Sequence, residues 1–356
     1  MVVKRRRPKP LLLIIIFGII MILMAFICMY LSSPVDRNND TEIKVEITSG
    51  TSTKEIASIL KEKELIRSEL LFQIHVKFYN APSLKADTYI FKQNMNLDEI
   101  VKILGAGSKY NPDMVKLTFK EGERITDYAK VISENTNNSY DDVIATINNK
   151  EYLNTLIIKY WFLTDSILTE GIYYPLEGYL APNTYHFDDK EVTTKEIIEK
   201  MLNQTNENLE KYKTTIENNV HNYITMASIV ELEGTNTENR KMIVGVFNNR
   251  LTSGMNLGSD VTTYYALQHP MTSDLTSAQF ATVNPYNTRS TTMIGKMPIG
   301  PICNPSNSSL EASANPTNND NLFFVADKKG NIYYTKTMAE HQQKINEIKE
   351  KGDWIW

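Results

Sequence analysis

Two glutamates separated by one residue, Glu231 and Glu233, are the side chains of this sequence best suited to acid–base chemistry. They follow an apolar run, 223–230, which contains no Gly or Pro and has the length of a buried helix. Gly234 comes next, and glycine commonly ends a helix in the left-handed conformation. We therefore expect both carboxylates at the end of a buried helix, where the helix dipole and apolar surroundings raise a carboxyl pKa. A carboxyl that is still protonated near neutral pH can act as a general acid.

Only one of the two carboxylates can face a given cleft, because residues two apart on a helix project roughly 200° apart. We expect the acid to be Glu233, which abuts Gly234 and the loop that follows, with Glu231 as the runner-up. Glu231 is then expected to be the more buried partner, paired with Arg250. The alternative is that Arg240 or Arg250 simply neutralises one of the carboxylates.

The N-terminal residues predict a membrane anchor. Five cations in residues 1–10 precede an uncharged apolar run, 11–31, and three acidic residues follow soon after it. Twenty-one residues at about 1.5 Å each cross a hydrocarbon core of roughly 30 Å. The cation asymmetry places the N-terminus in the cytoplasm and the rest of the chain outside the cell membrane. A cleaved signal peptide is the alternative, but the apolar run is long for one and no cleavage motif follows it.

Charge and composition exclude several classes of function. The net charge is −4, and it becomes −9 without the five N-terminal cations, so the outer part has no general basic surface for nucleic acid. The two cysteines, Cys28 and Cys303, lie too far apart in the chain to suggest a disulfide framework, and the five histidines lack metal-ligand spacing. We therefore expect neither a metal nor a cofactor.

The residues between the anchor and the two glutamates predict small α and β elements. After a linker, 32–42, we expect a strand at 43–47, helices at 54–63 and 68–79, a strand at 88–91 and a helix at 97–104. A strand at 115–119 and a helix at 125–132 follow, then helical sequence at 140–160, irregular aromatic sequence at 170–187 and an amphipathic helix at 195–218. Residues 269–321 are rich in Asn, Pro, Ser and Thr and predict loop, before a terminal hairpin and a closing helix at 338–351.

A series of short motifs runs in order from residue 177 to residue 341. They read E-G-Y-L-x-P-x-T-Y (177–185), A-S-I-V-E-x-E (227–233), E-x-R (238–240), V-F-x-N-R-L (246–251), G-M-x-L (254–257), S-D-x-T-x-x-Y-A-L (259–267), P-Y-N-T (285–288), P-x-G-P-I-C-N-P (298–305), F-V-A-D (324–327) and T-K-T-x-x-E-H (335–341). In this order and spacing they resemble the YceG-like family of endolytic murein transglycosylases.

The resemblance implies an α+β architecture with a single transmembrane helix. It divides the chain into a cytoplasmic basic tail (1–10), the transmembrane helix (11–31), the linker (32–42), a LysM-like module (43–110) and a mixed α/β YceG-like catalytic domain (111–356). LysM modules elsewhere bind the glycan of peptidoglycan. A unit that only braces the catalytic domain or holds it off the membrane is an equal alternative.

The resemblance also implies a lyase reaction on peptidoglycan glycan strands, which would trim or terminate nascent strands. The acid would cleave the β-1,4 bond between N-acetylmuramic acid and N-acetylglucosamine and leave 1,6-anhydro ends. Residues expected to grip sugar hydroxyl and acetamido groups are Glu177, Asn248, Ser259, Asp260, Tyr286 and Asn287, with loop-fixing hydrogen bonds as the alternative for each. Partners among cell-wall synthesis proteins are left open.

Two alternatives to the lyase remain. A non-catalytic peptidoglycan-binding scaffold would suit the anchor and the LysM-like unit equally well. A muramidase would release reducing ends by hydrolysis and would need a second carboxylate, for which Asp260 is the first candidate.

Overall fold

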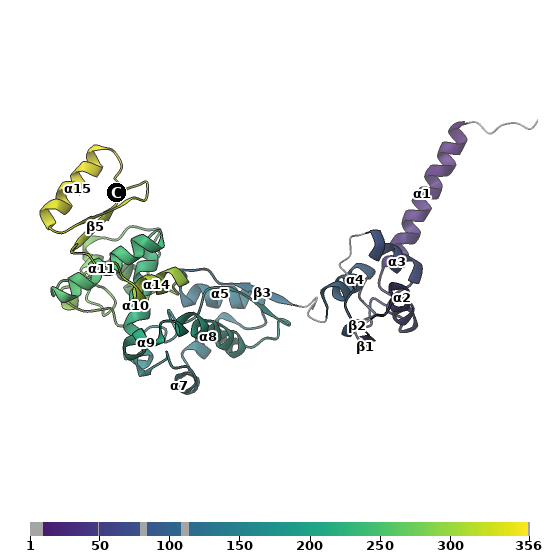
Figure 1. Ribbon diagram of the computed structural model, residues 1–356, viewed down its shortest axis with the longest axis horizontal. Coiled ribbons are helices and arrows are strands. Elements are labelled where there is room, and N and C mark those ends of the chain that lie inside the picture. The colour runs from purple at the N-terminus through teal and green to yellow at the C-terminus, as the bar shows by residue number, and fades with distance from the viewer. Residues whose placement is uncertain (1–9, 49, 79–83, 108–113, 355–356) are drawn as a thin grey trace, which may run out of the picture. The chain divides into compact units, whose positions relative to one another are not determined.

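The chain forms two compact units, Met1–Met114 and Val115–Trp356 (Figure 1). The computed structural model describes residues 10–48, 50–78, 84–107 and 114–354, with side chains from residue 17 onward. Residues 1–9 of the predicted basic tail, and the predicted domain limit between residues 110 and 111, lie outside the described residues.

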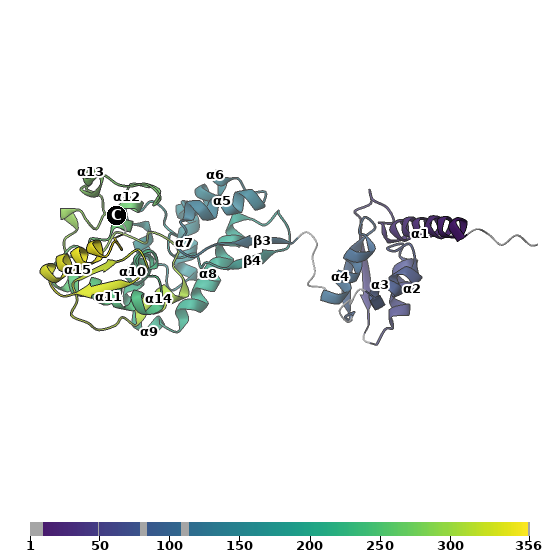
Figure 2. The same ribbon diagram turned by 90° about the horizontal axis from the view of Figure 1, so that it is seen from above.

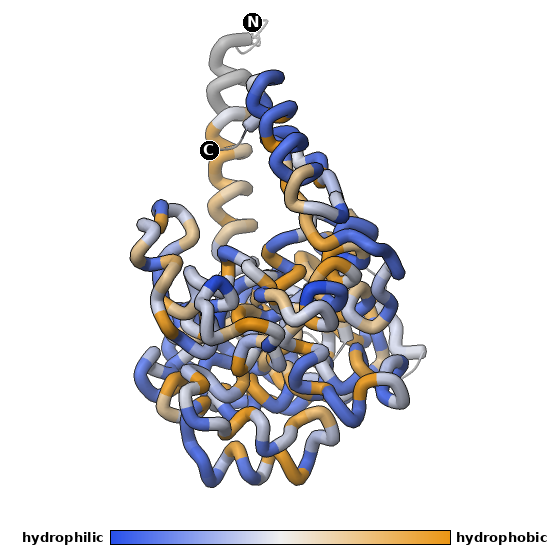
Figure 3. Tube along the Cα trace, turned by 90° about the vertical axis from the view of Figure 1, so that its left-hand side faces the viewer, coloured by the Kyte–Doolittle hydropathy of each residue, from blue (hydrophilic) through white to orange (hydrophobic). Residues whose placement is uncertain are grey.

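The first helix, α1 (Pro10–Ser32), covers the segment predicted to cross a membrane. Its described residues are largely apolar, as the colours of Figure 3 show, and most of its large apolar side chains are exposed. Among the described residues, no helix meets the length and apolarity needed to cross a membrane, so the anchor stays a prediction. The C-terminal end of α1 is tied to the first unit by Arg67, which donates to the hydroxyl of Tyr30 (3.0 Å) and the carbonyl of Pro34 (2.8 Å).

The rest of the first unit has the predicted order of strand, helix, helix, strand and helix. Its elements are β1 (Glu42–Ile47), α2 (Thr53–Glu62), α3 (Glu69–Phe78), β2 (Asp87–Lys92) and α4 (Leu97–Ala106). The two strands pair antiparallel, with Val45 opposite Tyr89. Capping boxes begin α2 and α4, at Ser52 and Asn96, because each cap side chain bonds the third helical N–H and receives the reciprocal bond. One cluster of buried apolar side chains from all five elements holds the unit together.

The second unit begins with a two-stranded antiparallel sheet surrounded by helices (Figure 2). Its elements are β3 (Val115–Thr118), α5 (Ile125–Asn135), α6 (Tyr140–Ile147), α7 (Lys150–Lys159), the 3-10 turn Asp165–Leu168, β4 (Thr184–Phe187) and α8 (Thr194–Glu210). Strand β4 lies in sequence predicted to be irregular. The helix predicted at 195–218 is wrong in its last third: α8 ends at Glu210, and α9 (Lys213–Ile216) and a 3-10 turn (Glu217–Asn219) follow. The break lets Tyr212 and Ile216 enter the core.

The central helix of the second unit is α10 (Val220–Glu233), which belongs to two hydrophobic cores. Ile224 and Ala227 pack in the core built on β3, β4 and the preceding helices, whereas Ile229 and Val230 pack in a second core. The second core includes α11 (Thr237–Thr252), α12 (Asp260–Ala266) and α14 (Asn307–Ala314). A helix that is apolar all round is typical of such a buried position. Burying each Ile or Val is worth about 1.5–3 kcal/mol, so the C-terminal end of α10 is firmly placed.

The segment predicted to be loop, 269–321, is only partly loop. It contains the short helix α13 (Ser277–Phe280), a 3-10 turn (Thr291–Met293) and α14, which packs on α10 and α11 (Figure 1). The expectation missed α14 because seven of its eight residues are Asn, Ser, Ala or Glu, with Leu310 as the one large apolar residue. The predicted hairpin and closing helix are confirmed as β5 (Phe323–Ala326), β6 (Ile332–Thr335) and α15 (Met338–Glu350).

Candidate active site

The two glutamates lie at the C-terminal end of α10, as predicted, and point into different surroundings. The helix ends when the N–H of Gly234 donates to the carbonyl of Val230 (3.0 Å). The prediction that Gly234 adopts the left-handed conformation is wrong, because its backbone is extended (φ −103°, ψ 136°). The glycine provides space instead: a Cβ there would lie 2.5 Å from Cγ of Arg240, which packs against the helix end.

Glu231 is fully engaged by neighbouring groups. Its Oε1 forms an ion pair with Arg240 (2.9 Å), and the Glu231 side chain is 6% exposed. Its Oε2 accepts hydrogen bonds from the N–H (2.8 Å) and hydroxyl (2.5 Å) of Ser306 and from the hydroxyl of Ser309 (2.6 Å). The expected pairing with Arg250 is therefore wrong, and Arg240 is the partner. A carboxylate that pairs with a cation and accepts three further hydrogen bonds is fully occupied by protein groups and serves the fold.

Within the described residues, Glu233 has no cation bonded to it and accepts from one neutral donor. The hydroxyl of Ser259 donates to its Oε1 at 2.6 Å. Loss of hydration raises the pKa of Glu233 to about 7, and the negative charge of Asp260 adds to this rise, while the Ser259 hydrogen bond and the charge of Arg250 oppose it. The two carboxylates therefore lie in different environments, one paired with a cation and the other bonded to a neutral hydroxyl. Such a difference between neighbouring carboxyl groups is typical of an acid–base site. Glu233 can hold a proton near neutral pH and still release it.

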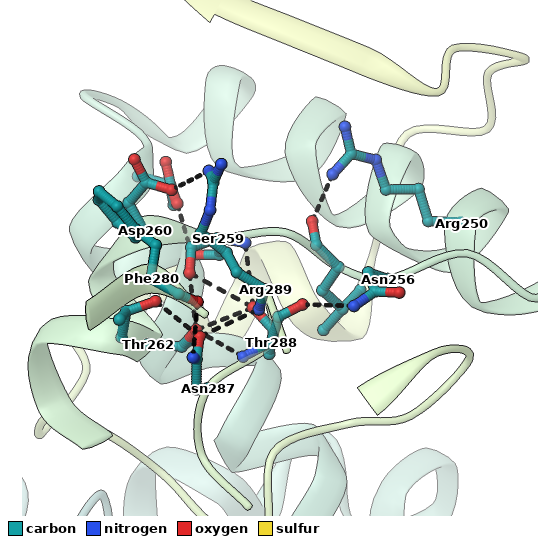
Figure 4. A network of polar contacts seen from close by, with 12 residues as sticks. Arg250, Asn256, Ser259, Asp260, Thr262, Phe280, Asn287, Thr288 and Arg289 are labelled. Atoms are coloured by element: carbon teal, nitrogen blue, oxygen red, sulfur yellow. Dashed lines mark hydrogen bonds and ion pairs between the residues drawn. The ribbon is translucent and has the colours of Figure 1, made fainter. Parts of the chain in front are cut away.

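Ser259 is locked in place by a buried cluster of hydroxyl groups (Figure 4). Its N–H donates to Oγ1 of Thr288 (3.0 Å), and its carbonyl accepts from Oγ1 of Thr262 (2.6 Å). The two threonine hydroxyls also lie 2.8 Å apart. All three residues are buried, with at most 3% exposed. Because every one of these groups has a partner, the Ser259 hydroxyl is held toward the acid and cannot readily turn away.

Arg250 joins the site to the C-terminal hairpin. Its Nε donates to the carbonyl of Leu322 (2.6 Å), and its Nη1 donates to the carbonyl of Leu257, as Figure 4 shows for the second contact. The guanidinium carbon lies 5.4 Å from the ring centroid of Phe323. Arg250 thus acts on Glu233 through its charge and not through a direct bond.

Glu177, Tyr286 and Asn287, three of the predicted sugar-contacting residues, are buried with at most 1% exposed. Glu177 accepts from the N–H of Ile125 (3.0 Å) and the hydroxyl of Tyr265 (3.1 Å), and burial raises its pKa to about 8. Asn287 accepts from Thr263 (2.7 Å) and donates to two carbonyls of its own loop. Their contacts in the structure are internal, so a direct grip on sugar stays a prediction.

The other predicted sugar-contacting residues are differently placed. Ser259 is buried and bonds the acid. Asp260 begins α12 with a partly exposed carboxylate, paired with Arg289 (2.5 Å). Asn248 lies on an exposed part of α11. Of the six predicted sugar-contacting residues, Ser259 bonds Glu233 and Asp260 acts on it through its charge. A role of the other four at the acid stays a prediction.

Several important residues were not singled out from the sequence. Asn304 is wholly buried, accepts from the N–H groups of Gly178 (3.0 Å) and Leu180 (3.2 Å), and donates to the carbonyl of Glu123 (3.2 Å). Ser228 accepts from the N–H of Ile302 (3.0 Å) and so fastens the same loop to α10. Ser228 lies in the motif 227–233 and Asn304 in the motif 298–305, and the two N–H groups that donate to Asn304 lie in the motif 177–185. Membership of these motifs was the signal that could have identified the two residues. In the described part of the chain, no three His, Cys, Asp or Glu side chains are arranged to hold a metal ion.

Comparisons with known proteins agree with this geometry. The model of the YceG-like family matches residues 45–347. A Bacillus subtilis (strain 168) protein named endolytic murein transglycosylase is 37% identical over 325 residues, which cover 90% of this chain and 88% of the relative. A Streptococcus pneumoniae (serotype 2, strain D39) protein of the same name is 32% identical over 334 residues, which cover 88% of this chain and 60% of the relative. A crystal structure of a YceG-like protein from Listeria monocytogenes matches with a TM-score of 0.60 and 36% identity, covering 86% of this chain and 99% of that one.

Proposed function

Because the chain belongs to the YceG-like family, we propose that it is an endolytic murein transglycosylase, a peptidoglycan lytic transglycosylase that cleaves within glycan strands. The observation that carries the mechanism is the contrast at the end of α10. Glu231 forms an ion pair with Arg240, whereas Glu233 accepts a hydrogen bond from the neutral Ser259 hydroxyl and burial raises its pKa to about 7. One carboxyl that can hold and return a proton is the minimum that this reaction requires.

Glu233 is the proposed catalytic residue. Its proton passes to the glycosidic oxygen as the bond from that oxygen to C1 of N-acetylmuramic acid breaks. The 6-hydroxyl of the same sugar then attacks C1, and its proton passes to the Glu233 carboxylate. The products are a strand ending in 1,6-anhydro-N-acetylmuramic acid and a strand with a free N-acetylglucosamine 4-hydroxyl, and no water is consumed. Because the nucleophile is intramolecular, its effective concentration replaces that of a positioned water.

The surroundings of the other acids favour the lyase over hydrolysis. An inverting hydrolase needs a second carboxylate about 6.5–9.5 Å from the first to activate water. Of the three further acids with a claim, Glu177 is buried against protein donors, Asp260 is paired with Arg289, and Glu238 is exposed beside Lys241 (3.6 Å). In the described part of the chain and without substrate, none of the three is an unpaired base facing Glu233.

The test is product analysis of purified glycan strands after digestion in heavy-oxygen water. We expect new ends lighter by one water and free of the label, and Glu233→Gln should lower the rate by about 10²–10⁴ because it removes the acid. Labelled reducing ends would identify a muramidase, with Asp260 as the second carboxylate to test. An ectodomain that binds strands without cutting them would identify a scaffold.

We further propose that α1 anchors the protein in the cell membrane with its N-terminus in the cytoplasm. The supporting observations are the cations before the helix and the exposed apolar side chains along it. Protease added to intact spheroplasts should digest the outer part and spare an N-terminal tag. Protection of a C-terminal tag would contradict a single span in this orientation.

For the first unit, we propose a LysM-like module. The β1, α2, α3, β2 order supports this, as does a shallow surface depression beside the start of α2 that is lined by Thr48, Gly50, Thr51, Glu55, Ser58 and Ile59. Polar side chains around one apolar residue suit a sugar ring. Pull-down of the full chain on insoluble murein, with Thr51→Glu as the variant, distinguishes glycan binding from a bracing role, since a brace would leave retention unchanged.

A further inference from the structure

A partly exposed arginine, Arg289, pairs with Asp260, the residue whose charge acts on the acid. Its side chain is 43% exposed. The guanidinium contacts the Asp260 carboxylate at 2.5 Å, and its carbon lies 4.8 Å from the ring centroid of Phe280 (Figure 4). The two residues before it, Asn287 and Thr288, are wholly buried. Its own N–H donates to Oδ1 of Asn287 (3.1 Å). The backbone is therefore fixed while the charged head remains accessible.

The buried backbone before Arg289 is linked to the catalytic residue through two side chains. Thr288, which precedes it, holds Ser259 through the Ser259 N–H (3.0 Å), and Ser259 donates to Glu233 (2.6 Å). Asp260, the partner of Arg289, follows Ser259 and acts on Glu233 through its charge. The guanidinium is thus placed at the exposed side of the site.

The guanidinium groups of the other arginines near Glu233 are already bonded to protein acceptors. Arg240 is 12% exposed and bonds the buried Glu231. Arg250 donates to two backbone carbonyls. In contrast, within the described residues only Nη1 of the Arg289 guanidinium has a protein acceptor. An exposed ion pair is worth about 0–1 kcal/mol, so Asp260 can be replaced by another carboxylate at little cost.

We propose that Arg289 binds a carboxylate of the glycan strand and that, in the absence of substrate, it pairs with Asp260 instead. The proposal rests on the proposed function and names a determinant of its substrate. A planar guanidinium binds carboxylates through two parallel N–H bonds, which gives orientation as well as affinity. Peptide-free strands present the lactyl carboxylate of muramic acid, and peptide-bearing strands present the carboxylates of the stem peptide.

Two strand types locate the carboxylate that Arg289 binds. Steady-state release of anhydro ends is measured for the full chain on peptide-free strands and on peptide-bearing strands, each as prepared and after its carboxylates are converted to neutral methylamides. The variants are Arg289→Gln and Arg289→Lys, and the matched control is Lys296→Gln, which removes an equal charge from an exposed position of the same segment. Wild-type release on all strands verifies the proposed function independently.

We expect Arg289→Gln to raise KM by about ten- to a hundredfold with little change in kcat, because a hydrogen bond to a charged group is worth a factor of that order. The increase should vanish on methylamide strands, and Arg289→Lys should restore part of the affinity. An increase in KM on peptide-free strands would identify the lactyl carboxylate as the group that Arg289 binds. An increase confined to peptide-bearing strands would identify a carboxylate of the stem peptide. Equal losses on charged and neutral strands, or no change on any, would overturn the proposal.

Discussion

The hydroxyl of Ser259 should set the pH at which the enzyme loses activity. Glu233 must be protonated in the free enzyme, so kcat/KM should fall as pH rises through its pKa of about 7. Ser259 donates to the carboxylate (2.6 Å), which favours the charged form and lowers the pKa. Replacing Ser259 with Ala removes that effect, and the alkaline limb should move to higher pH.

The expected size of this shift follows from the strength of the bond. A hydrogen bond to a charged group contributes about 1.5–3 kcal/mol, and one pKa unit corresponds to about 1.4 kcal/mol. The limb should therefore move upward by about one to two units. The plateau rate should also fall, because the acid is less well oriented, but the midpoint of the limb is the diagnostic quantity.

The assay is the initial rate of anhydro-end release at subsaturating strand concentration between pH 5 and pH 9.5. Ser253→Ala is the matched control, since Ser253 is an exposed serine at the end of α11. It should leave the midpoint unchanged. A Ser259→Ala limb that stays near pH 7 or moves to lower pH would refute the role of the Ser259 hydroxyl in lowering the pKa of Glu233.

Three further variants test the surroundings of the acid. Glu231→Gln leaves the cation of Arg240 without its charged partner, and we expect a loss of about 3–5 kcal/mol in the free energy of unfolding, measured by urea denaturation; a loss below 1 kcal/mol would contradict the structural role. Glu177 has a pKa of about 8, raised by burial, so its contribution to stability is complete below its ordinary pKa near 4.5 and is lost as pH rises through 8. Glu177→Gln should therefore match the wild-type melting temperature at pH 5 and exceed it at pH 9, and the reverse order at pH 9 would refute burial of a neutral carboxyl. Gly178 has φ +84°, and a Cβ there would lie 2.4 Å from Cβ of Pro301, so Gly178→Ala should lower the melting temperature and the activity together, whereas a fully stable variant would show that the contact is readily relieved.

The sequence predicted the elements with clear periodicity or apolar runs, and it placed the two glutamates at the end of a buried helix. Geometry alone indicated that Glu231 and Glu233 would face apart, and the structure bears this out through their different partners. The partner of Glu231 was predicted wrongly because Arg240 and Arg250 both lie on the next helix, one near each end, and the choice depends on how that helix packs.

The remaining errors have related causes. Helix α14 lacks an apolar face in its sequence, yet Ser309 within it and Ser306 at its cap supply donors to Glu231. Strand β4 consists of four residues between aromatic turns, so its alternation was too short to recognise. The extended Gly234 depends on the approach of Arg240, which is a tertiary contact. Local patterns carry no information about such contacts.

The position of α10 in both cores of the second unit has a consequence for cooperativity. Neither half of that unit can unfold alone without uncovering apolar side chains of the same helix, among them Ile224 on one side and Ile229 on the other. Backbone amides in the middle of α10 should therefore exchange with solvent deuterium only through opening of the whole unit. Loss of activity on heating should then coincide with global unfolding, since the helix that presents the acid is among the last elements to open.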